Sequence, residues 1–140
     1  MENKITAYVD GSFNVETHTY AYGCVIIKPD GETITLSGSD NNPEVAIIRN
    51  VAGEMLGAMN AVKWAKKEGY SEIEICYDYS GIEMWATGKW KAKNKYTKGY
   101  ADYMRTSAEK IKITYTKVEA HTGVKYNEMA DRLARAALDK

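Results

Sequence analysis

The sequence predicts an α/β domain in which helices flank a mixed five-stranded sheet. Apolar and polar side chains alternate in three runs over residues 5–39, and turn residues separate the runs, which indicates an antiparallel meander. A long helical pattern then leads to a fourth strand, and a connection of that kind suits a parallel pairing with the first strand. A fifth strand and a last amphipathic helix complete the pattern, so parallel strands extend an antiparallel half.

Length and composition limit the possible functions. A chain of 140 residues is enough for one domain, expected to span residues 1–140, with a sizeable core. The formal net charge is zero, so binding of a nucleic acid would need a local basic patch. Cys24 and Cys76 lie in apolar strand-like runs and are expected to be buried, reduced thiols. No apolar run approaches the roughly 20 residues that span a bilayer, so we expect no membrane partner. The N-terminus leads straight into a strand without the pattern of a signal peptide, so we expect a cytoplasmic location, and a monomer is the default expectation.

The first strand, Ile5 to Ser12, organises the chain. Its alternating pattern ends in Asp10, which the turn-forming pair Gly11-Ser12 follows. A polar turn over residues 13–19 leads to a second strand at residues 20–28. Asp30-Gly31 is a strong hairpin signal before a third strand at residues 32–39. We therefore expect a carboxylate at the end of a central strand, where it faces water, a cation or a metal.

A long helix is expected over residues 45–67, and Gly69 ends it. Small residues recur along one face of this helix at Ala58, Ala61 and Ala65, and the same face continues back to Glu54. This stripe predicts packing against the sheet. A carboxylate in that position is costly to bury unless a positive charge compensates it.

The fourth strand, at residues 72–78, also ends in a carboxylate, Asp78. If it lies parallel to the first strand, Asp78 and Asp10 sit at the carboxyl ends of neighbouring strands, where open α/β sheets place their sites. The remaining elements are a short helix at 81–86, a lysine-rich stretch at 87–100, a helix at 100–110, a strand at 111–118 and a helix at 125–138. The last helix has an inward face formed by Asn127, Ala130, Asp131, Ala134 and Leu138.

Each of the four acids has a structural explanation when it is taken alone. Asp10 suits a turn, Asp78 suits a helix cap, Glu54 suits the first turn of a helix, and Asp131 suits an ion pair with Arg135. Taken together, they would place four carboxylates at one edge of one sheet. Such carboxylates repel each other unless metal ions bridge them. Oxygen-only ligands favour Mg²⁺ or Mn²⁺, as in two-metal phosphoryl-transfer sites.

One histidine lies close to the last of these acids in the sequence. His121 belongs to a loop between the fifth strand and the last helix. A lone histidine is more often structural, but a loop histidine beside a metal site is able to shuttle a proton.

Four motifs in this order resemble the type 1 ribonucleases H, and most closely their bacterial members. The most specific is the segment His121-Thr122-Gly123-Val124-Lys125-Tyr126-Asn127-Glu128-Met129-Ala130-Asp131, which matches the His-x-Gly-x-x-x-Asn-Glu-x-Ala-Asp pattern of the family at every fixed position. The other motifs are Val9-Asp10-Gly11-Ser12, Asn50-Val51-Ala52-Gly53-Glu54 and Tyr77-Asp78. The order of the predicted elements is that of the ribonuclease H fold.

The resemblance implies an endonuclease that uses two Mg²⁺ ions, with Mn²⁺ as a possible substitute. Such an enzyme cuts the RNA strand of an RNA–DNA hybrid and leaves a 3′-hydroxyl and a 5′-phosphate. By the family pattern, Asp10 bridges both ions and Asp131 completes the site of the ion that activates water. Glu54 and Asp78 hold the ion that stabilises the leaving oxygen, and His121 assists proton transfer or product release.

The same resemblance implies residues that contact the hybrid. Gly11 and Ser12 match positions beside the cleaved strand, while Asn50 and Asn127 match positions that contact the substrate or its water. The stretch from Lys89 to Lys98, with Trp85 and Trp90, matches a region that binds the DNA strand in several members. The alternative interpretation of this stretch is a solvent-exposed lysine loop beside tryptophans of the core.

Three other functions compete with this one. The first is a module that has the same fold and binds hybrids without cutting them. Such a module would be expected to lack at least one of the four acids, and all four are present. A phosphatase of the haloacid-dehalogenase type needs an aspartate two residues before Asp10, and Tyr8 stands there. Another nuclease of the same fold, such as an integrase or a junction resolvase, lacks the His-x-Gly and Asn-Glu-x-Ala-Asp signature.

Overall fold

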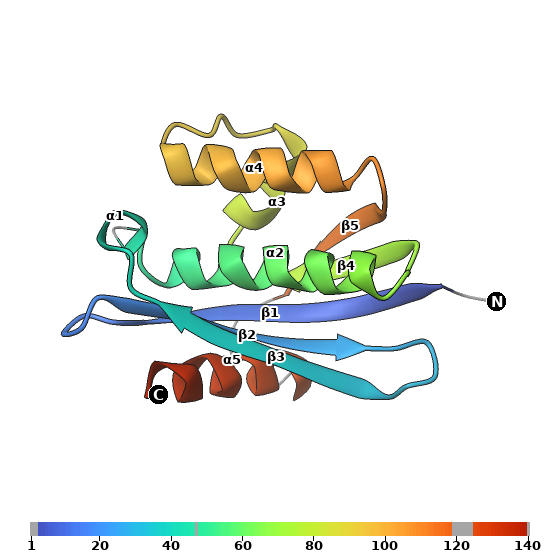
Figure 1. Cartoon of the computed structure of the whole chain (residues 1–140), viewed down its shortest axis with the longest axis horizontal. Coiled ribbons are helices and arrows are strands. Elements are labelled where there is room, and N and C mark those ends of the chain that lie inside the picture. The colour runs from blue at the N-terminus through green and yellow to red at the C-terminus, as the bar shows by residue number, and fades with distance from the viewer. Residues whose placement is uncertain (1–2, 47, 119–124, 140) are drawn as a thin grey trace.

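The protein is described by a computed structural model that covers residues 3–46, 48–118 and 125–139. Within these residues, five strands form one sheet in the order β3-β2-β1-β4-β5 (Figure 1). The pairs β1–β2 and β2–β3 are antiparallel, and the pairs β1–β4 and β4–β5 are parallel, which confirms the predicted mixed sheet. The strands are β1 (Lys4–Asn14), β2 (Thr19–Ile27), β3 (Thr33–Asp40), β4 (Glu72–Tyr77) and β5 (Lys112–Lys117).

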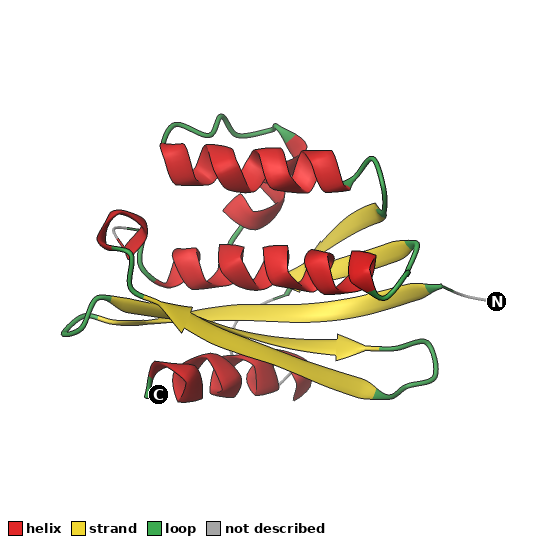
Figure 2. Ribbon diagram, in the orientation of Figure 1, coloured by secondary structure: helices red, strands yellow, loops and turns green. Residues whose placement is uncertain are grey.

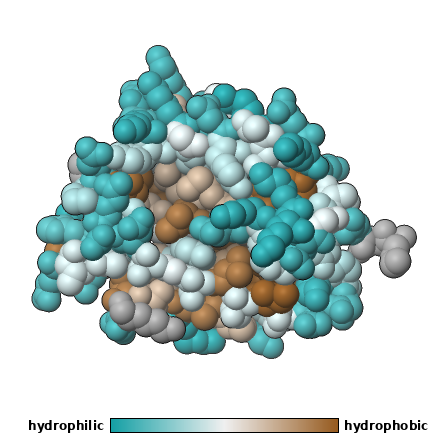
Figure 3. Space-filling model, in the orientation of Figure 1, coloured by the Kyte–Doolittle hydropathy of each residue, from teal (hydrophilic) through white to brown (hydrophobic). Residues whose placement is uncertain are grey.

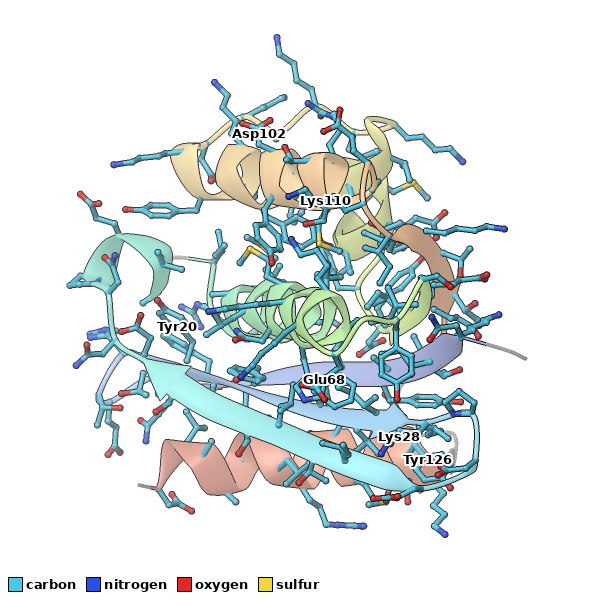
Figure 4. All side chains as sticks on the ribbon, turned by 45° about the vertical axis from the view of Figure 1, so that its right-hand side comes forward. Tyr20, Lys28, Glu68, Asp102, Lys110 and Tyr126 are labelled. Carbon is cyan, nitrogen blue, oxygen red and sulfur yellow. The ribbon has the colours of Figure 1, made fainter. Side chains whose placement is uncertain are left out.

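Helices cover the sheet on both faces, as Figure 2 shows. The described helices are α1 (Pro43–Ala46), α2 (Asn50–Lys67), α3 (Gly81–Thr87), α4 (Lys95–Ser107) and α5 (Lys125–Leu138). α2 lies on one face of the sheet and α5 on the other, while α3 and α4 form a further layer outside α2. In Figure 4, Asp102 marks α4 in this outer layer, and Tyr126 marks α5 on the opposite side of the sheet.

The core lies between the sheet and α2 because both surfaces are apolar there. Ile5, Ala7 and Val9 alternate along β1 and are buried, as the period of a strand requires. The predicted small-residue stripe of α2 (Ala58, Ala61 and Ala65) is completely buried and belongs to the same cluster. Small side chains on that stripe allow the helix to lie close to the strands.

Two glycines bring the helices on both faces close to the first hairpin. A Cβ on Gly23 of β2 would lie 2.1 Å from the carbonyl oxygen of Ala130 in α5. A Cβ on Gly53 of α2 would lie 2.0 Å from the carbonyl oxygen of Ala21 in β2. Neither position has room for any other residue. The two contacts fix the distance of both helices from β1 and β2.

The first strand is longer than the sequence predicted. The expected turn at Gly11-Ser12 is wrong, because Asp10 pairs with Gly23 and the pairing with β2 continues to Asn14. Gly11 stays in the extended strand, and the turn comes later, where the side chain of Asn14 accepts hydrogen bonds from the backbone N–H groups of Glu16 and Thr17. Asp10 therefore lies within a strand rather than at its end.

The long helix expected over residues 45–67 is interrupted. Arg49 has φ 53° and ψ −131°, and a residue in that conformation cannot continue an α-helix. α1 therefore forms a separate turn, and its Ala46 packs with Tyr20 and Ala52 in a small second cluster. The predicted end is confirmed, because Gly69 follows α2 with φ 83°, and the N–H of Tyr70 donates to the carbonyl of Ala65.

The fourth helix begins five residues before its predicted start at Tyr100. The side chain of Asn94 accepts hydrogen bonds from the N–H groups of Tyr96 and Thr97, and Thr97 completes a capping box. Residues 95–100 are therefore helical rather than part of a lysine-rich loop. Tyr100 is a core residue, and its hydroxyl donates to the carbonyl oxygen of Ile82.

Several other expectations hold. Cys24 and Cys76 are buried free cysteines, and the bounds of α5 are those predicted. On α5, Ala137 is buried where the pattern favoured Leu138, which is half-buried. Among the described helices, none is long and apolar enough to cross a membrane. The face seen in Figure 3 is largely hydrophilic, with hydrophobic side chains visible in patches between the elements.

The close approach of α5 to β2 makes a stability prediction. Replacing Gly23 with Ala should lower the free energy of unfolding by about 3 kcal/mol, because the new Cβ meets backbone atoms of α5 that cannot move independently. The matched control is Gly99→Ala at an exposed position of α4, where a Cβ meets nothing within 4 Å. That change should raise the free energy of unfolding by about 0.5 to 1 kcal/mol through helix propensity. Urea unfolding of the three proteins checks both signs, and equal stabilities would contradict the packing.

Candidate active site

The candidate site lies where β1 and β4 separate. Their parallel pairing ends at Tyr8 and Cys76, while β1 continues along β2 and β4 stops at Tyr77. Asp10 and Asp78 each lie two residues beyond this last β1–β4 pair. This opening matters because side chains from opposite faces of a sheet can meet only where the sheet is not continuous.

One side of the opening is a cavity of about 450 Å³, here called the Asp131 cavity. Asp10, Asp78 and Asp131 line it. Asp131 comes from α5, which lies against Gly23 directly beside Asp10 in the sheet. The Oδ1 of Asp10 accepts a hydrogen bond of 2.9 Å from the N–H of Gly11.

The other side is a cavity of about 380 Å³, here called the Glu54 cavity, which Asp10, Glu54 and Asp78 line. Glu54 comes from α2 on the opposite face of the sheet, and only 3% of it is exposed. Its carboxylate accepts hydrogen bonds from the N–H groups of Asp78 (2.8 Å) and Tyr79 (3.2 Å). Glu54 thus fixes the segment that follows β4 as well as lining the cavity. Asp10 and Asp78 are common to both cavities.

Crowding changes the acidity of two of these carboxyl groups. Burial, together with the neighbouring carboxylates of Asp131 and Asp78, raises the pKa of Asp10 to about 7 against the opposing effect of the hydrogen bond from the N–H of Gly11. Burial likewise raises the pKa of Glu54 to about 8, with the charges of Asp10 and Asp78 adding to the effect. The site therefore disfavours full ionisation of its acids unless a cation is present.

The structural explanations for the single acids fail in three of four cases. Asp10 lies within a strand rather than in a turn. Glu54 lies beyond the first turn of α2, and the residue before α3 is Ser80 rather than Asp78. Only Asp131 has the expected partner, since its Oδ2 lies 3.0 Å from Nη2 of Arg135.

Several predicted substrate contacts lie at these cavities. Gly11, Ser12 and Asn127 line the Asp131 cavity. Trp90 lines the Glu54 cavity and is 42% exposed. Trp85 contacts Trp90 with a ring-centroid distance of 6.1 Å but does not line either cavity.

Three of the predicted site residues are not seen at either cavity in the described part of the structure. Lys89 is exposed and is not part of the lining of either cavity. Asn50 begins α2, but its side chain lies outside what the structure describes. His121 also lies outside the described residues.

The cavities contain positive residues that the sequence analysis did not assign to the site. Arg49 and Arg135 line the Asp131 cavity, and Lys117 lines the Glu54 cavity. Arg49 also lies over the ring of Phe13, at 5.8 Å from its centroid. None of these three residues belongs to a motif recognised in the sequence. The sequence offered only weak indications for two of them: Arg135 lies one helical turn after Asp131, and Lys117 interrupts an otherwise apolar row of β5.

The donor set fits a hard divalent cation. It consists of the four carboxylates that line the two cavities. Oδ1 of Asn127, in the lining of the Asp131 cavity, is a buried oxygen that lacks a hydrogen-bond partner in the described part of the chain. Among residues 3–46, 48–118 and 125–139, no three acidic, histidine or cysteine side chains converge tightly enough to hold one ion as they stand. Carboxylates that share a site repel each other, and a bound cation would offset this repulsion.

Comparison with known proteins decides the family. Residues 2–139 match the profile of the RNase H family, which is almost the whole chain. The chain belongs to the ribonuclease H family. The resemblance inferred from the sequence motifs is thereby confirmed, and the chain is assigned to the nucleases.

Two relatives and two solved structures illustrate the similarity of this ribonuclease H. Ribonuclease HI of Synechocystis sp. is 29% identical over 145 residues, covering 96% of this chain and 88% of that protein. Ribonuclease H of Pseudoalteromonas translucida is 29% identical over 147 residues, covering 98% and 91%. RNase H1 of the halophilic archaeon Halobacterium salinarum superimposes with a TM-score of 0.81 at 25% identity, covering 97% and 98%. LC11-RNase H1, solved in complex with an RNA/DNA hybrid, has a TM-score of 0.74 at 18% identity, covering 96% and 99%, and supports the fold alone.

The raised carboxyl pKa values predict how the stability of the metal-free ribonuclease H depends on pH. A carboxyl group with a pKa that is higher in the folded state stabilises the fold below its unfolded pKa, and this stabilisation is lost as pH rises through the folded value. For Asp10 and Glu54 the loss should occur as pH rises through about 7 and about 8. In chelator, the melting temperature should therefore rise on acidification from about pH 9 to about pH 6.

The variant Asp10→Asn isolates this effect. At about pH 8 it should raise the free energy of unfolding above that of the wild type by on the order of 1 to 2 kcal/mol, with a higher melting temperature, and at about pH 5 the difference should be much smaller. Thermal unfolding followed by circular dichroism checks the difference. A variant that is less stable than wild type at the higher pH would contradict the proposed crowding.

Proposed function

We propose that this ribonuclease H is an Mg²⁺-dependent endonuclease that hydrolyses the RNA strand of RNA–DNA hybrids. The observation that supports it best is the pair of adjoining cavities that share Asp10 and Asp78. One adds Asp131 and the other adds Glu54, so the acids divide into two overlapping sets. This division suits two cations that share a bridging carboxylate.

In this proposal, Asp10 and Asp131 would hold one Mg²⁺ ion, and Asp10, Glu54 and Asp78 the other, with Mn²⁺ as a possible substitute. When bound in such a site, the two ions activate an attacking water and stabilise the leaving 3′-oxygen, so the products carry a 3′-hydroxyl and a 5′-phosphate.

The residues of the chain position these groups. Glu54 accepts the N–H groups of Asp78 and Tyr79, which keeps the segment after β4 next to Asp10. Oδ1 of Asn127, buried and without a partner among the described residues, is able to accept a hydrogen bond from the water or from a ribose hydroxyl. His121 is proposed to take up or release a proton during turnover.

The proposed substrate is a hybrid duplex. Recognition would use ribose 2′-hydroxyls in the minor groove and would be largely independent of sequence. The solved hybrid complex of LC11-RNase H1, which shares this fold, supports the choice of a hybrid as substrate.

We further propose that residues 1–140 act as one catalytic domain and that the protein acts as a monomer. Trp85, Lys89 and Trp90 are proposed to contact the DNA strand. The two buried free thiols are consistent with a cytoplasmic location.

The test is cleavage of a labelled RNA–DNA hybrid in Mg²⁺, compared with single-stranded RNA, duplex RNA and duplex DNA. Cutting should be confined to the RNA strand of the hybrid, and the fragments should carry 3′-hydroxyl ends that a ligase can join. Asp10→Asn should lower the rate at least about a hundredfold, because it removes the carboxylate common to both cavities.

The matched control is Asp102→Asn, which removes an exposed carboxylate on α4 that pairs with Arg105. It should leave the rate unchanged. A folded protein that binds the hybrid but does not cut it in Mg²⁺ or Mn²⁺ would contradict the proposal and favour a binding module.

A further inference from the structure

Lys117 occupies a position that the pattern of β5 reserves for an apolar side chain. Alternate residues of a strand share one face, and on this face Ile113 and Tyr115 pack against the main core. Lys117 continues the same row at the end of the strand, yet it is charged and exposed. The apolar row of β5 thus ends in an exposed positive charge rather than in another apolar side chain.

The strand pairing carries Lys117 to the Glu54 cavity. Lys117 is paired with Tyr77, the residue directly before Asp78. A hydrogen bond of 2.7 Å from the N–H of Val118 to the carbonyl of Tyr77 fixes the ends of the two strands beside each other. Lys117 therefore lines the same cavity as the carboxylates of Glu54 and Asp78.

The ammonium of Lys117 is available to a ligand. In the described part of the chain, the ion pairs join other residues, and no carboxylate oxygen lies within ion-pair distance of Lys117. Lys4 of the same sheet shows the contrast, since its Nζ lies 3.6 Å from Glu72 and 3.9 Å from Glu74. The wall of the cavity also carries Trp90, so the charge lies beside an aromatic surface that is 42% exposed.

We propose that Lys117 binds a backbone phosphate of the cleaved strand, on the 5′ side of the cut. This inference rests on the proposed function and names one of its substrate contacts. A nucleic-acid strand that enters the Glu54 cavity brings phosphates towards three carboxylates, and this repulsion needs a local positive charge. The 5′ side follows because the proposed leaving 3′-oxygen lies at Glu54 and Asp78, and that oxygen belongs to the nucleotide upstream of the cut.

The test measures equilibrium binding of a hybrid in the Asp10→Asn background, so that cleavage does not disturb the equilibrium. Lys117→Met should weaken binding about three- to tenfold at moderate salt and reduce the slope of log affinity against log salt by about 1. The matched control is Lys112→Met, at the opposite end of the same strand and also exposed, which should change neither quantity. Lys117→Arg keeps the charge and should retain most of the affinity.

Single neutral methylphosphonates in the RNA strand then locate the contact. At one position 5′ of the cut, the methylphosphonate should weaken binding of the hybrid to the Asp10→Asn protein. At the same position it should not change the affinity of the protein that also carries Lys117→Met. Circular dichroism spectra and melting temperatures confirm that the variants are folded.

Unchanged affinity and salt slope in folded Lys117→Met, while the wild type still cuts hybrids, would overturn this proposal and leave the nuclease function intact. A methylphosphonate effect that is additive with Lys117→Met at every position would also overturn it. A wild-type protein that neither binds nor cuts hybrids would overturn the proposed function and this inference with it.

Discussion

The close approach of α2 and α5 to the first hairpin, on opposite faces of the sheet, is the constraint on which the rest of the structure depends. Gly53 of α2 lies against the backbone of Ala21, and Gly23 of β2 lies against the backbone of Ala130 in α5. With any larger residue at either position, a helix would have to move away from the sheet. Glu54 follows directly after the first of these contacts, and Asp131 comes one residue after Ala130. The packing of the core therefore sets how far each carboxylate lies from Asp10.

Packing this tight places acids where they repel each other. Burial and the neighbouring carboxylates raise the pKa of Asp10 to about 7, while burial raises the pKa of Glu54 to about 8 with a smaller contribution from its neighbours. The burial of apolar surface between α2 and the sheet offsets the repulsion between these carboxylates. Ala58, Ala61 and Ala65 of α2 are completely buried in that core. A site that is destabilised by its own charges gains most from a bound cation. Positive residues, Arg135 and Lys117, also line the two cavities.

The antiparallel meander, the parallel pairing of β4 with β1 and the gathering of the four acids at one place could be predicted from local patterns. Alternation in β1 and small-residue spacing in α2 are such patterns, and so is the motif that ends at Asp131. Local patterns could not predict that β1 continues beyond Asp10. The pair Gly11-Ser12 favours a turn, but pairing with β2 keeps these residues in the strand. The interruption at Arg49 depends on a backbone conformation that arginine rarely adopts, φ 53°. Lys117 carried a usable signal, since it breaks the apolar row of β5, but only the pairing with Tyr77 places it beside the acids.

The central claim is that Asp10 serves two cation sites, one in each cavity. Its most direct test is anomalous diffraction from a crystal of the wild-type protein with Mn²⁺ and a hybrid that carries a 2′-deoxy nucleotide at the cut to prevent cleavage. The account predicts two anomalous peaks on either side of Asp10, one beside Asp131 and one beside Glu54 and Asp78. A single peak that does not contact Asp10, or no peak in either cavity at saturating Mn²⁺, would contradict it.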